Sequence, residues 1–435
     1  MNKKVALRYE DRFNMERRVA IIPKHVEQLS KKYGLEFFVE TSEKRIFSDD
    51  EYKAAGAKIV DNVNDIPVIF GVKEMPLDIF RPNHTYIFFS HTIKGQPYNM
   101  PSLKKMVEQK VNLIDYEKVR DEHGRRTIFF GKYAGLAGMI NTLWTLGMRL
   151  KEKGISTPFE HLKQSHKYNS LDEAKTAISK VGMEIVKNGL PGELTPVVIG
   201  ITGYGNVSTG AQEILSLLPC KEISPNELLE LDNDKSLPDN VIYKVIFKEH
   251  HLAKPKNNTD KFELQDYYQH PEKYRGTFEQ YIDKLTVLVN AMYWDTRYPK
   301  LITNEYLKKN YNKDHKLIAI GDITCDPKGS VECTTDCTTI ENPVFIFDPK
   351  TGKHQDGFKG EGIAIMGVDI LPSELPRESS IGFSDALFDH VNDIVTCDYS
   401  ENYEDLKLPA PIKRALILHN GKFTPEFEYM EEYIK

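Results

Sequence analysis

Short runs of apolar residues alternate with longer amphipathic segments through the first third of the chain. The apolar runs include VALRY, LEFFVE, PVIFGV, TYIFFS and VNLIDY, and the amphipathic segments include PKHVEQLSKKYG and SLKKMVEQK. Several runs are apolar at consecutive positions, which is typical of parallel strands that are buried on both faces. The alternation of such strands with helices predicts an α/β fold with a mostly parallel sheet.

The rest of the chain repeats this alternation and predicts a second sheet. A long helix is expected at 134–154, where a basic last turn and a glycine close the pattern, and a charged helix at 171–188. Buried strands are expected at 196–202, 286–294 and 316–323. The helix at 134–154 is long enough to connect two domains.

We therefore expect two Rossmann-like α/β domains, each with a parallel sheet flanked by helices, and a cleft between them. Residues 1–140, completed by 375–435, are expected to form a catalytic domain that binds the substrates. Residues 141–374 are expected to form a Rossmann domain that binds a dinucleotide. The polar and aromatic stretch at 254–280 fits a surface insertion, which could be a lid, an oligomer contact or neither.

The composition excludes several other classes of protein. The 435 residues include 58 basic and 64 acidic side chains, a net charge of −6, without a long block of one sign, which argues against a broad nucleic-acid-binding surface. The N-terminus lacks the apolar stretch of a signal peptide, and no run of about 18 apolar residues indicates a membrane span. We expect a cytoplasmic protein. Five cysteines do not suggest a disulfide framework, and no metal site is expected.

The clearest chemical motif is VVIGITGYGNVSTGAQEILSLL at 197–218, in which a glycine turn lies between an apolar strand and a helical pattern. Gly203 and Gly205 allow a tight turn and a close approach of the backbone to a pyrophosphate, which would lie at the helix start near Asn206 and Val207. The third glycine of the usual pattern is replaced by Ser208 in this chain. The position of the turn between a strand and a helix predicts dinucleotide binding.

The identity of the cofactor depends on residues after the next strand. The acidic residue that binds the ribose of NAD is expected about 20 positions after the first glycine, near CKEISP at 220–225. Glu222 could bind that ribose, whereas Lys221 and Ser224 would favour the 2′-phosphate of NADP. We expect NADPH, with NADH as the alternative. Asp322 lies at a strand end before a glycine turn, where a cofactor contact and a simple turn aspartate fit equally well.

Two basic residues follow apolar runs in the first domain. Lys73 follows PVIFGV, and His91 follows TYIFFS. If the two strands are neighbours in a parallel sheet, both side chains lie at its carboxyl edge, where α/β sheets bind ligands. A partly desolvated lysine and a histidine can both move protons near neutral pH. Glu74 and Glu117 could tune this pair. The other interpretation, a solvated strand end and a hydrogen-bonded loop histidine, has equal weight at this point.

Two pairs of arginines lie in the same part of the chain. Arg17 and Arg18 occur in ERRVAIIP just before a helix, and Arg125 and Arg126 occur in HGRR. The planar guanidinium group is suited to bidentate binding of a substrate carboxylate. Each of these arginines, taken alone, is more often a surface charge.

Several motifs together resemble a known family. They are ERRVAIIPKH, FGVKEMP, FFSHTIKGQ, LIDYEKVRDEHGRR, FGKYAGLAGMINTL, ITGYGNVSTGAQEI, DITCDPKGSVECTTDCTTIENP and FSDALFDHV. In this order they resemble the lysine-ketoglutarate reductase domain, the N-terminal half of bifunctional aminoadipic semialdehyde synthase. The wider relatives are the lysine-forming saccharopine dehydrogenases, alanine dehydrogenase and the soluble nucleotide-binding part of transhydrogenase.

The resemblance implies an NADPH-dependent oxidoreductase of lysine metabolism. Its substrates would be L-lysine and 2-oxoglutarate, whose imine is reduced by hydride transfer to saccharopine. The acid-base residues of the family fall on Lys73 and His91, and its neighbouring glutamates fall on Glu74 and Glu117.

The carboxylate-binding arginines of the family fall on Arg18 and Arg126, and the adjacent Arg17 and Arg125 could share that role. Asp322 matches an aspartate at the nucleotide-facing strand end of the alanine dehydrogenase relatives. The saccharopine-cleaving half of the bifunctional proteins has no counterpart in this sequence, so a separate dehydrogenase is an expected partner. A homo-oligomer is also possible.

Two other functions are open on the sequence alone. The chain could reductively aminate another 2-oxo acid, as alanine dehydrogenase does, with ammonia or a different amine. It could also be a regulatory module that binds a nucleotide without catalysis. The presence of both Lys73 and His91 favours an enzyme.

Overall fold

The computed structural model divides the chain into two compact units. Unit 1 contains residues 1–130 and 376–435, and unit 2 contains residues 131–375. The residues that the structure describes are 2–231, 237–312 and 315–435. The first boundary therefore lies at residue 130 rather than at the expected 140, because the long helix that begins at Gly131 packs entirely within unit 2.

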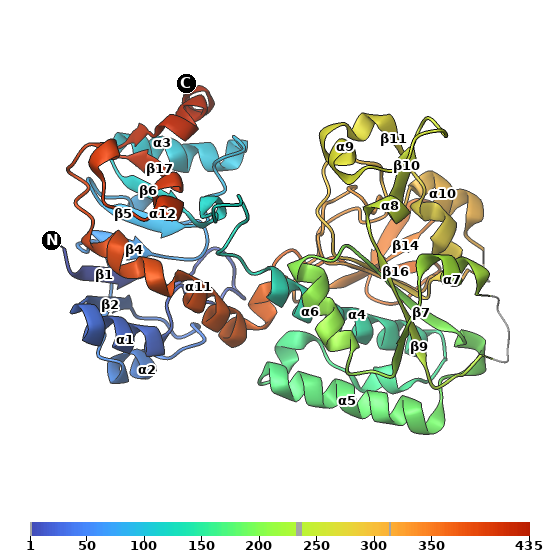
Figure 1. Ribbon diagram of the computed structural model, residues 1–435. Coiled ribbons are helices and arrows are strands. Elements are labelled where there is room, and N and C mark those ends of the chain that lie inside the picture. The colour runs from blue at the N-terminus through green and yellow to red at the C-terminus, as the bar shows by residue number, and fades with distance from the viewer. Residues whose placement is uncertain (1, 232–236, 313–314) are drawn as a thin grey trace. The chain divides into compact units, whose positions relative to one another are not determined.

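The sheet of unit 1 has the order β18-β17-β6-β5-β4-β1-β2-β3 (Figure 1). From β1 to β6 the neighbouring strands pair in parallel, and β17 and β18 join one edge through antiparallel pairs. The strands are β1 (Lys4–Leu7), β2 (Glu36–Glu40), β3 (Lys58–Val60), β4 (Val68–Phe70), β5 (Thr85–Phe88), β6 (Asn112–Asp115), β17 (Leu416–His419) and β18 (Lys422–Phe423).

Both faces of this sheet are covered, which explains why its strands are apolar at consecutive positions. Val68 and Phe70 of β4 join a core with helices on one face, whereas Ile69 joins the core on the other face. The helices of the first face are α1 (Pro23–Tyr33), α2 (Asp49–Ala54), α11 (Pro376–Thr396) and α12 (Ala410–Arg414). The helix α3 (Met100–Glu108) packs on the second face.

The sheet of unit 2 has the order β15-β14-β16-β13-β12-β7-β9-β8 and is parallel from β8 to β16. Its strands are β7 (Val197–Thr202), β8 (Cys220–Glu222), β9 (Ile242–Phe247), β12 (Val287–Asn290), β13 (Ala319–Asp322), β14 (Val344–Asp348), β15 (Lys353–Asp356) and β16 (Ile363–Met366). The helices α7 (Pro225–Glu230) and α10 (Asn304–Asn310) contribute to the core on one face. The two mostly parallel sheets with flanking helices confirm the predicted α/β class.

The remaining elements of unit 2 are helices of the other face and a small subdomain. The helices are α4 (Gly131–Glu152), α5 (Leu171–Asn188) and α6 (Asn206–Leu215). The subdomain covers most of the expected insertion and contains β10 (Ala253–Pro255), α9 (Leu264–Gln269) and β11 (Tyr274–Gly276), with β10 and β11 paired antiparallel, and the short helix α8 (Glu249–Leu252) connects it to β9. The expected surface insertion is therefore an ordered element with a sheet of its own.

The strand order of unit 2 differs from the usual dinucleotide-binding order, in which the second strand of the chain pairs with the first. In this chain β9 pairs with β7 along six residues, and β8 pairs only with β9 at the edge. The sequence of β9, IYKVIF, is mostly buried, whereas the three residues of β8, CKE, are half-buried or exposed. The more apolar strand takes the interior position because that position removes more apolar surface from water.

Two glycines let α4 and α6 cross at close range. A Cβ atom added at Gly210 would lie 2.1 Å from the carbonyl oxygen of Lys132, and one added at Gly135 would lie 1.9 Å from that of Val207. Gly210 therefore serves a close contact between the two helices. The same contact explains why α4 belongs to unit 2.

We expect Gly210→Ala to destabilise the protein by about 1–3 kcal/mol, because the new methyl group collides with rigid backbone. The midpoint of chemical denaturation, followed by circular dichroism, measures this effect. Gly192→Ala is a matched control, because its added Cβ would meet no atom of the described residues within 4 Å. Equal midpoints for Gly210→Ala and the wild type would contradict the prediction.

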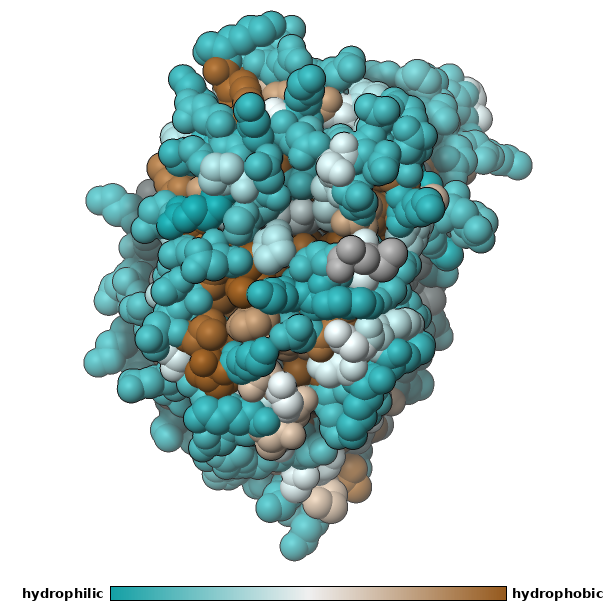
Figure 2. All heavy atoms as spheres, turned by 90° about the vertical axis from the view of Figure 1, so that its left-hand side faces the viewer, coloured by the Kyte–Doolittle hydropathy of each residue, from teal (hydrophilic) through white to brown (hydrophobic). Residues whose placement is uncertain are grey.

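Figure 2 views unit 1 from the side that is on the left in Figure 1. Hydrophilic residues cover most of this face, and hydrophobic side chains gather in a hollow near its centre. A pocket of about 410 Å³ opens at the amino ends of β4 and β5, where Val68, Thr85 and Tyr399 are among the lining residues. This pocket lies at the opposite edge of the sheet from Lys73 and His91, so it is not part of their site.

Among the residues that the structure describes, no helix is long and apolar enough to cross a membrane.

Candidate active site

Lys73 and His91 lie at the same edge of the unit 1 sheet. The strands β4 and β5 are parallel neighbours, with Phe70 opposite Ile87, and Lys73 and His91 follow their carboxyl ends. Backbone pairing continues past the strands through a hydrogen bond from the Phe89 N–H to the Val72 carbonyl oxygen, 3.0 Å long. The strand arrangement on which the predicted pair depends is therefore present.

His91 is held by a carboxylate and by its own backbone conformation. Its Nδ1 atom lies 2.7 Å from Oε1 of Glu74. Burial opposes ionisation of Glu74, but the hydrogen bond and charge of His91, with the charge of Lys73, outweigh it and lower the pKa of Glu74. His91 has φ +51°, an uncommon conformation for a residue with a side chain. Strained backbone of this kind gathers at functional sites.

Glu10, which the sequence prediction missed, fixes the backbone that carries Lys73. Its two carboxylate oxygens accept hydrogen bonds from the N–H groups of Val72 (2.6 Å) and Lys73 (2.8 Å). Glu10 is 4% exposed, and burial, together with the nearby charge of Glu16, raises its pKa to about 7. Its position just after the first apolar run was the available signal, because that run becomes β1, the neighbour of β4.

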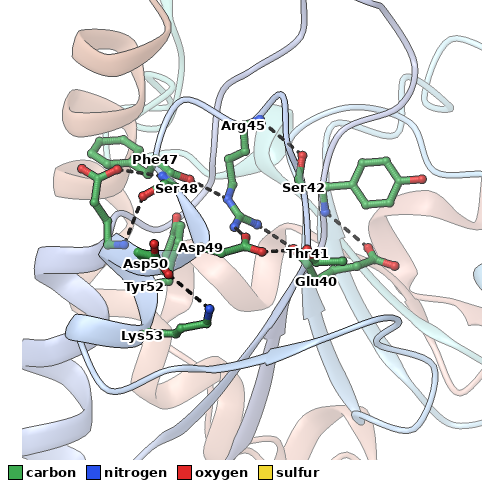
Figure 3. A network of polar contacts seen from close by, with 12 residues as sticks. Glu40, Thr41, Ser42, Arg45, Phe47, Ser48, Asp49, Asp50, Tyr52 and Lys53 are labelled. Atoms are coloured by element: carbon green, nitrogen blue, oxygen red, sulfur yellow. Dashed lines mark hydrogen bonds and ion pairs between the residues drawn. The ribbon is translucent and has the colours of Figure 1, made fainter.

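A further network stabilises the backbone next to Glu10 (Figure 3). The buried Arg45 donates a hydrogen bond to the carbonyl oxygen of Glu40 (2.7 Å) and pairs with Asp49. The Glu40 carboxylate in turn accepts a hydrogen bond from the N–H of Tyr9 (3.3 Å), the residue before Glu10. The end of β2 thus supports the segment that positions Lys73.

Arg18 is buried and forms a bidentate pair with Glu16. Its Nε atom donates to Oε1 (2.8 Å) and its Nη2 atom to Oε2 (2.6 Å), and its guanidinium lies 4.1 Å from the ring centroid of Phe130. Burial of Glu16 raises its pKa, but the charge and hydrogen bonds of Arg18, with the charge of Lys73, produce a net lowering. A carboxylate that binds Arg18 must therefore share it with Glu16.

Arg126 lies beside the same cluster and is less tightly engaged. Its Nη1 atom is 4.0 Å from Oε1 of Glu117, and its guanidinium is 5.9 Å from the ring centroid of Phe89, which also stacks on His91. Burial lowers the pKa of Arg126, and the charges of Glu117 and Asp115 oppose this effect. The distance to Glu117 is long for a hydrogen-bonded pair, so a substrate carboxylate can replace it.

The two adjacent arginines face other parts of the chain. Arg17 is exposed and donates a hydrogen bond to the carbonyl oxygen of Lys44 (2.9 Å). Arg125 pairs with Asp121 (2.8 Å) in an exposed turn. Since neighbouring residues of an extended chain point in opposite directions, only one member of each pair lies with Lys73. The structure does not bring Arg17 and Arg125 to this cluster.

The glycine turn of unit 2 has the features of a phosphate-binding loop. Gly203 has φ +83°, and Gly205 precedes the first residues of α6, Asn206 and Val207. Within the described part of the chain, no side chain caps this helix, and a Cβ atom added at Gly205 would meet no atom within 4 Å. This open space and the uncapped N–H groups fit the pyrophosphate of a nicotinamide dinucleotide. Ser208 is buried, and its Oγ accepts a hydrogen bond from Gln212 (3.1 Å).

Asp322 is a buried structural group at the end of β13. Its Oδ1 accepts a hydrogen bond from Asn290 (2.8 Å) and its Oδ2 from Thr334 (2.6 Å). Burial raises the pKa of Asp322. Asn290 also accepts a hydrogen bond from Thr202 (2.9 Å), so the ends of β7, β12 and β13 are tied together. Asp322 therefore shapes the edge of the sheet through these hydrogen bonds.

Glu222 and Ser224 lie away from the glycine turn. Glu222 is on the edge strand β8, where it pairs with Lys244 of β9 (2.6 Å). Lys244 in turn pairs with Ile199, near the middle of β7. The Ser224 hydroxyl accepts a hydrogen bond from the Glu227 N–H and caps α7. The spacing rule that pointed to these residues assumes that the second strand is next to the first, and the intervening β9 corrects that assumption.

The chain is similar to known proteins over most of its length. Residues 6–137 match the family model of the alanine dehydrogenase/PNT N-terminal domain. The chain is 40% identical over 430 residues to the alpha-aminoadipic semialdehyde synthase of Arabidopsis thaliana, which covers 95% of this chain and 40% of that protein. The chain thus spans less than half the length of this relative.

Two further comparisons concern proteins of similar length. The chain is 25% identical over 378 residues to a saccharopine dehydrogenase [NAD(+), L-lysine-forming] of Yarrowia lipolytica, which covers 86% of this chain and 87% of that protein. The match to a solved structure of L-alanine dehydrogenase covers 99% of this chain and 100% of the alanine dehydrogenase chain, with a TM-score of 0.63 at 16% identity, which shows a shared fold.

Among the described residues, no group of three or more His, Cys, Asp or Glu side chains could hold a metal ion.

Proposed function

We propose that this chain joins L-lysine to 2-oxoglutarate and reduces the resulting imine to saccharopine. The chain is a relative of the alpha-aminoadipic semialdehyde synthases and saccharopine dehydrogenases, with an alanine dehydrogenase/PNT N-terminal domain, and this relationship supports the proposal. The reductant is NADPH. One observation carries the proposal: Lys73 and His91 lie at one sheet edge, His91 is bonded to Glu74, and a partly exposed arginine is beside them.

The acid-base cluster suits the proton transfers that this reaction needs. The ε-amine of lysine must lose a proton before it attacks the 2-oxo carbon, and the resulting carbinolamine must gain one before water leaves. Lys73 and His91 relay these protons. Glu74 holds Nδ1 of His91, so the other ring nitrogen is available for the transfer.

The arginines suit the charge of the substrates. 2-Oxoglutarate has two carboxylates, and Arg126 and Arg18 are guanidinium groups in the part of unit 1 that contains Lys73. Arg126 binds one carboxylate in exchange for its long contact with Glu117, and Arg18 shares another with Glu16. Such anchoring brings the amine and the carbonyl together and supplies much of the rate. Bound NADPH supplies the hydride that reduces the imine carbon.

The direct test is the oxidation of NADPH, followed by its absorbance, with L-lysine and 2-oxoglutarate together. We expect turnover only when both are present, and saccharopine as the product by mass spectrometry. Ammonia in place of lysine is the control for an enzyme of the alanine dehydrogenase type. Oxidation that is no faster with both substrates than with 2-oxoglutarate and ammonia would reject the proposal.

A further inference from the structure

The side chains that follow β9 lie beside the glycine turn, because β9 is the strand next to β7. Thr202 is opposite Phe247, and the Gly203 N–H donates a hydrogen bond to the Phe247 carbonyl oxygen (2.9 Å). The next residue is Lys248, whose ammonium lies 5.6 Å from the ring centroid of Tyr204 within the turn. In dinucleotide-binding folds, the residue that follows the strand beside the first contacts the adenosine ribose.

A pocket of about 410 Å³ lies beside this turn, within the size range of small-molecule sites. Its wall contains three tyrosines whose rings are unusually open to solvent: Tyr204 is 50% exposed, Tyr268 is 39% exposed and Tyr293 is 76% exposed. Buried aromatic rings are the rule because their apolar faces gain from leaving water. Three open rings in one pocket therefore provide flat surfaces on which a planar ring system can stack.

The subdomain at 253–276 supplies one wall of this pocket. Tyr267 and Tyr274 are buried in a small core with Ala253, and Phe262 and Tyr298 pack against it. This core orders the helix α9, which presents the adjacent Tyr268 to the pocket. The Tyr268 hydroxyl donates a hydrogen bond to Glu249 (2.7 Å) and so joins the subdomain to the end of β9.

The charged groups at the end of β9 bear on whether the adenosine bound there has a 2′-phosphate or lacks one. Glu249 accepts a hydrogen bond from the hydroxyl of Tyr268. His251 accepts a hydrogen bond from the Lys248 N–H, and burial followed by the charge of His250 lowers the pKa of His251 to about 4, so this ring is neutral near pH 7. The Lys248 ammonium lies beside the turn and can bind a phosphate group.

We infer that the tyrosine-lined pocket binds the adenosine 2′-phosphate end of NADPH, with Lys248 in contact with the 2′-phosphate and the adenine stacked on Tyr268. This assignment rests on the use of NADPH in the proposed function. It also gives a role to the subdomain at 253–276, which forms the wall against which the adenine packs.

The test uses two fragments of the cofactor, adenosine 2′,5′-bisphosphate and 5′-AMP, titrated into the full chain by calorimetry. We expect Lys248→Met to raise the dissociation constant of the bisphosphate at least about tenfold, and that of 5′-AMP less than about twofold, because only the bisphosphate has the 2′-phosphate. Lys221→Met is the matched control, since Lys221 lies on the edge strand β8. A loss in Lys221→Met without one in Lys248→Met would overturn the inference.

Tyr268 is tested with the same two fragments. Tyr268→Ala is expected to weaken both by a similar factor of about five to ten, because both contain adenine, and Tyr268→Phe is expected to restore binding. Unchanged binding in Tyr268→Ala would overturn the adenine assignment. A wild type that binds 5′-AMP as tightly as the bisphosphate would overturn the 2′-phosphate contact. Tight binding of the bisphosphate without lysine-dependent turnover would reject the proposed substrates and support the assignment of the pocket to the adenosine 2′-phosphate.

Discussion

The double variant Lys73→Met, His91→Gln is expected to lower kcat for lysine-dependent NADPH oxidation by about 10³- to 10⁴-fold. Both side chains lie at the carboxyl edge of β4 and β5, and the substituted groups cannot exchange protons near neutral pH. The two residues act in one relay, so each single variant should lose nearly as much as the double variant. Initial rates with saturating lysine, 2-oxoglutarate and NADPH measure the loss.

Lys94→Met is the control for this experiment. Lys94 is an exposed lysine a few residues after His91, so its substitution removes a nearby positive charge without touching the cluster. It should keep a rate close to that of the wild type. NADPH affinity, measured by titration, should be the same in all of these variants, because the glycine turn, where we propose that the nucleotide binds, is in unit 2. A double variant that keeps more than about a tenth of the wild-type rate would remove Lys73 and His91 from the relay.

Glu10→Gln is expected to lower kcat on the order of 10- to 100-fold, because it releases the backbone that positions Lys73. A carboxylate accepts hydrogen bonds from both the Val72 and the Lys73 N–H groups, whereas an amide has only one acceptor and turns an NH₂ group toward the other N–H. Wild-type activity should rise with pH through about 7, where Glu10 ionises. This rise should be absent in Glu10→Gln.

The contribution of Glu10 to the stability of the protein should fall as the pH rises, whereas the activity should rise. The unfolded carboxyl group loses its proton near its ordinary pKa of 4.5, whereas the folded group keeps it up to about 7. Between these values the folded chain binds more protons, so the contribution of Glu10 is full below 4.5 and is lost as the pH rises through 7. The loss is about 3 kcal/mol, because the pKa of Glu10 is roughly 2.5 higher in the folded chain than in the unfolded chain.

Denaturation midpoints at several pH values separate this effect from general titration. The wild type should lose stability between pH 5 and 7 relative to Glu10→Gln, which has no proton to exchange. Glu27→Gln serves as the control, since Glu27 is an exposed carboxylate on α1 and its removal should leave the pH dependence unchanged. Parallel curves for the wild type and Glu10→Gln would contradict the raised pKa.

The site of unit 1 could be predicted in part because its geometry follows from local patterns. Consecutive apolar residues identified β4 and β5 as buried parallel strands, and parallel neighbours end at the same edge, so Lys73 and His91 could be placed together. Glu10 could not be linked to Lys73 in this way. It lies 62 positions from Val72, and their contact requires β1 to be next to β4, which depends on the order of the whole sheet.

The arginines show a second limit of prediction from the sequence alone. ERR and HGRR place two arginines side by side, and either member could point to the substrates. Burial decides between them: Arg18 enters the core with Glu16 and Phe130, and Arg17 remains exposed. The sequence does not contain this choice, because it depends on which neighbours surround the backbone after folding.

The sequence by itself determined the local elements of this protein: the apolar strands, the helices between them, the glycine turn before α6 and the polar character of the subdomain. These depend on spacing and on residue type, which are local properties. Only the tertiary structure decided which strand lies beside β7. The apolar β9 excluded the short, polar β8 from the sheet interior, because burial favours the strand with more apolar surface, and Lys248 instead of Glu222 therefore came to lie next to the glycine turn.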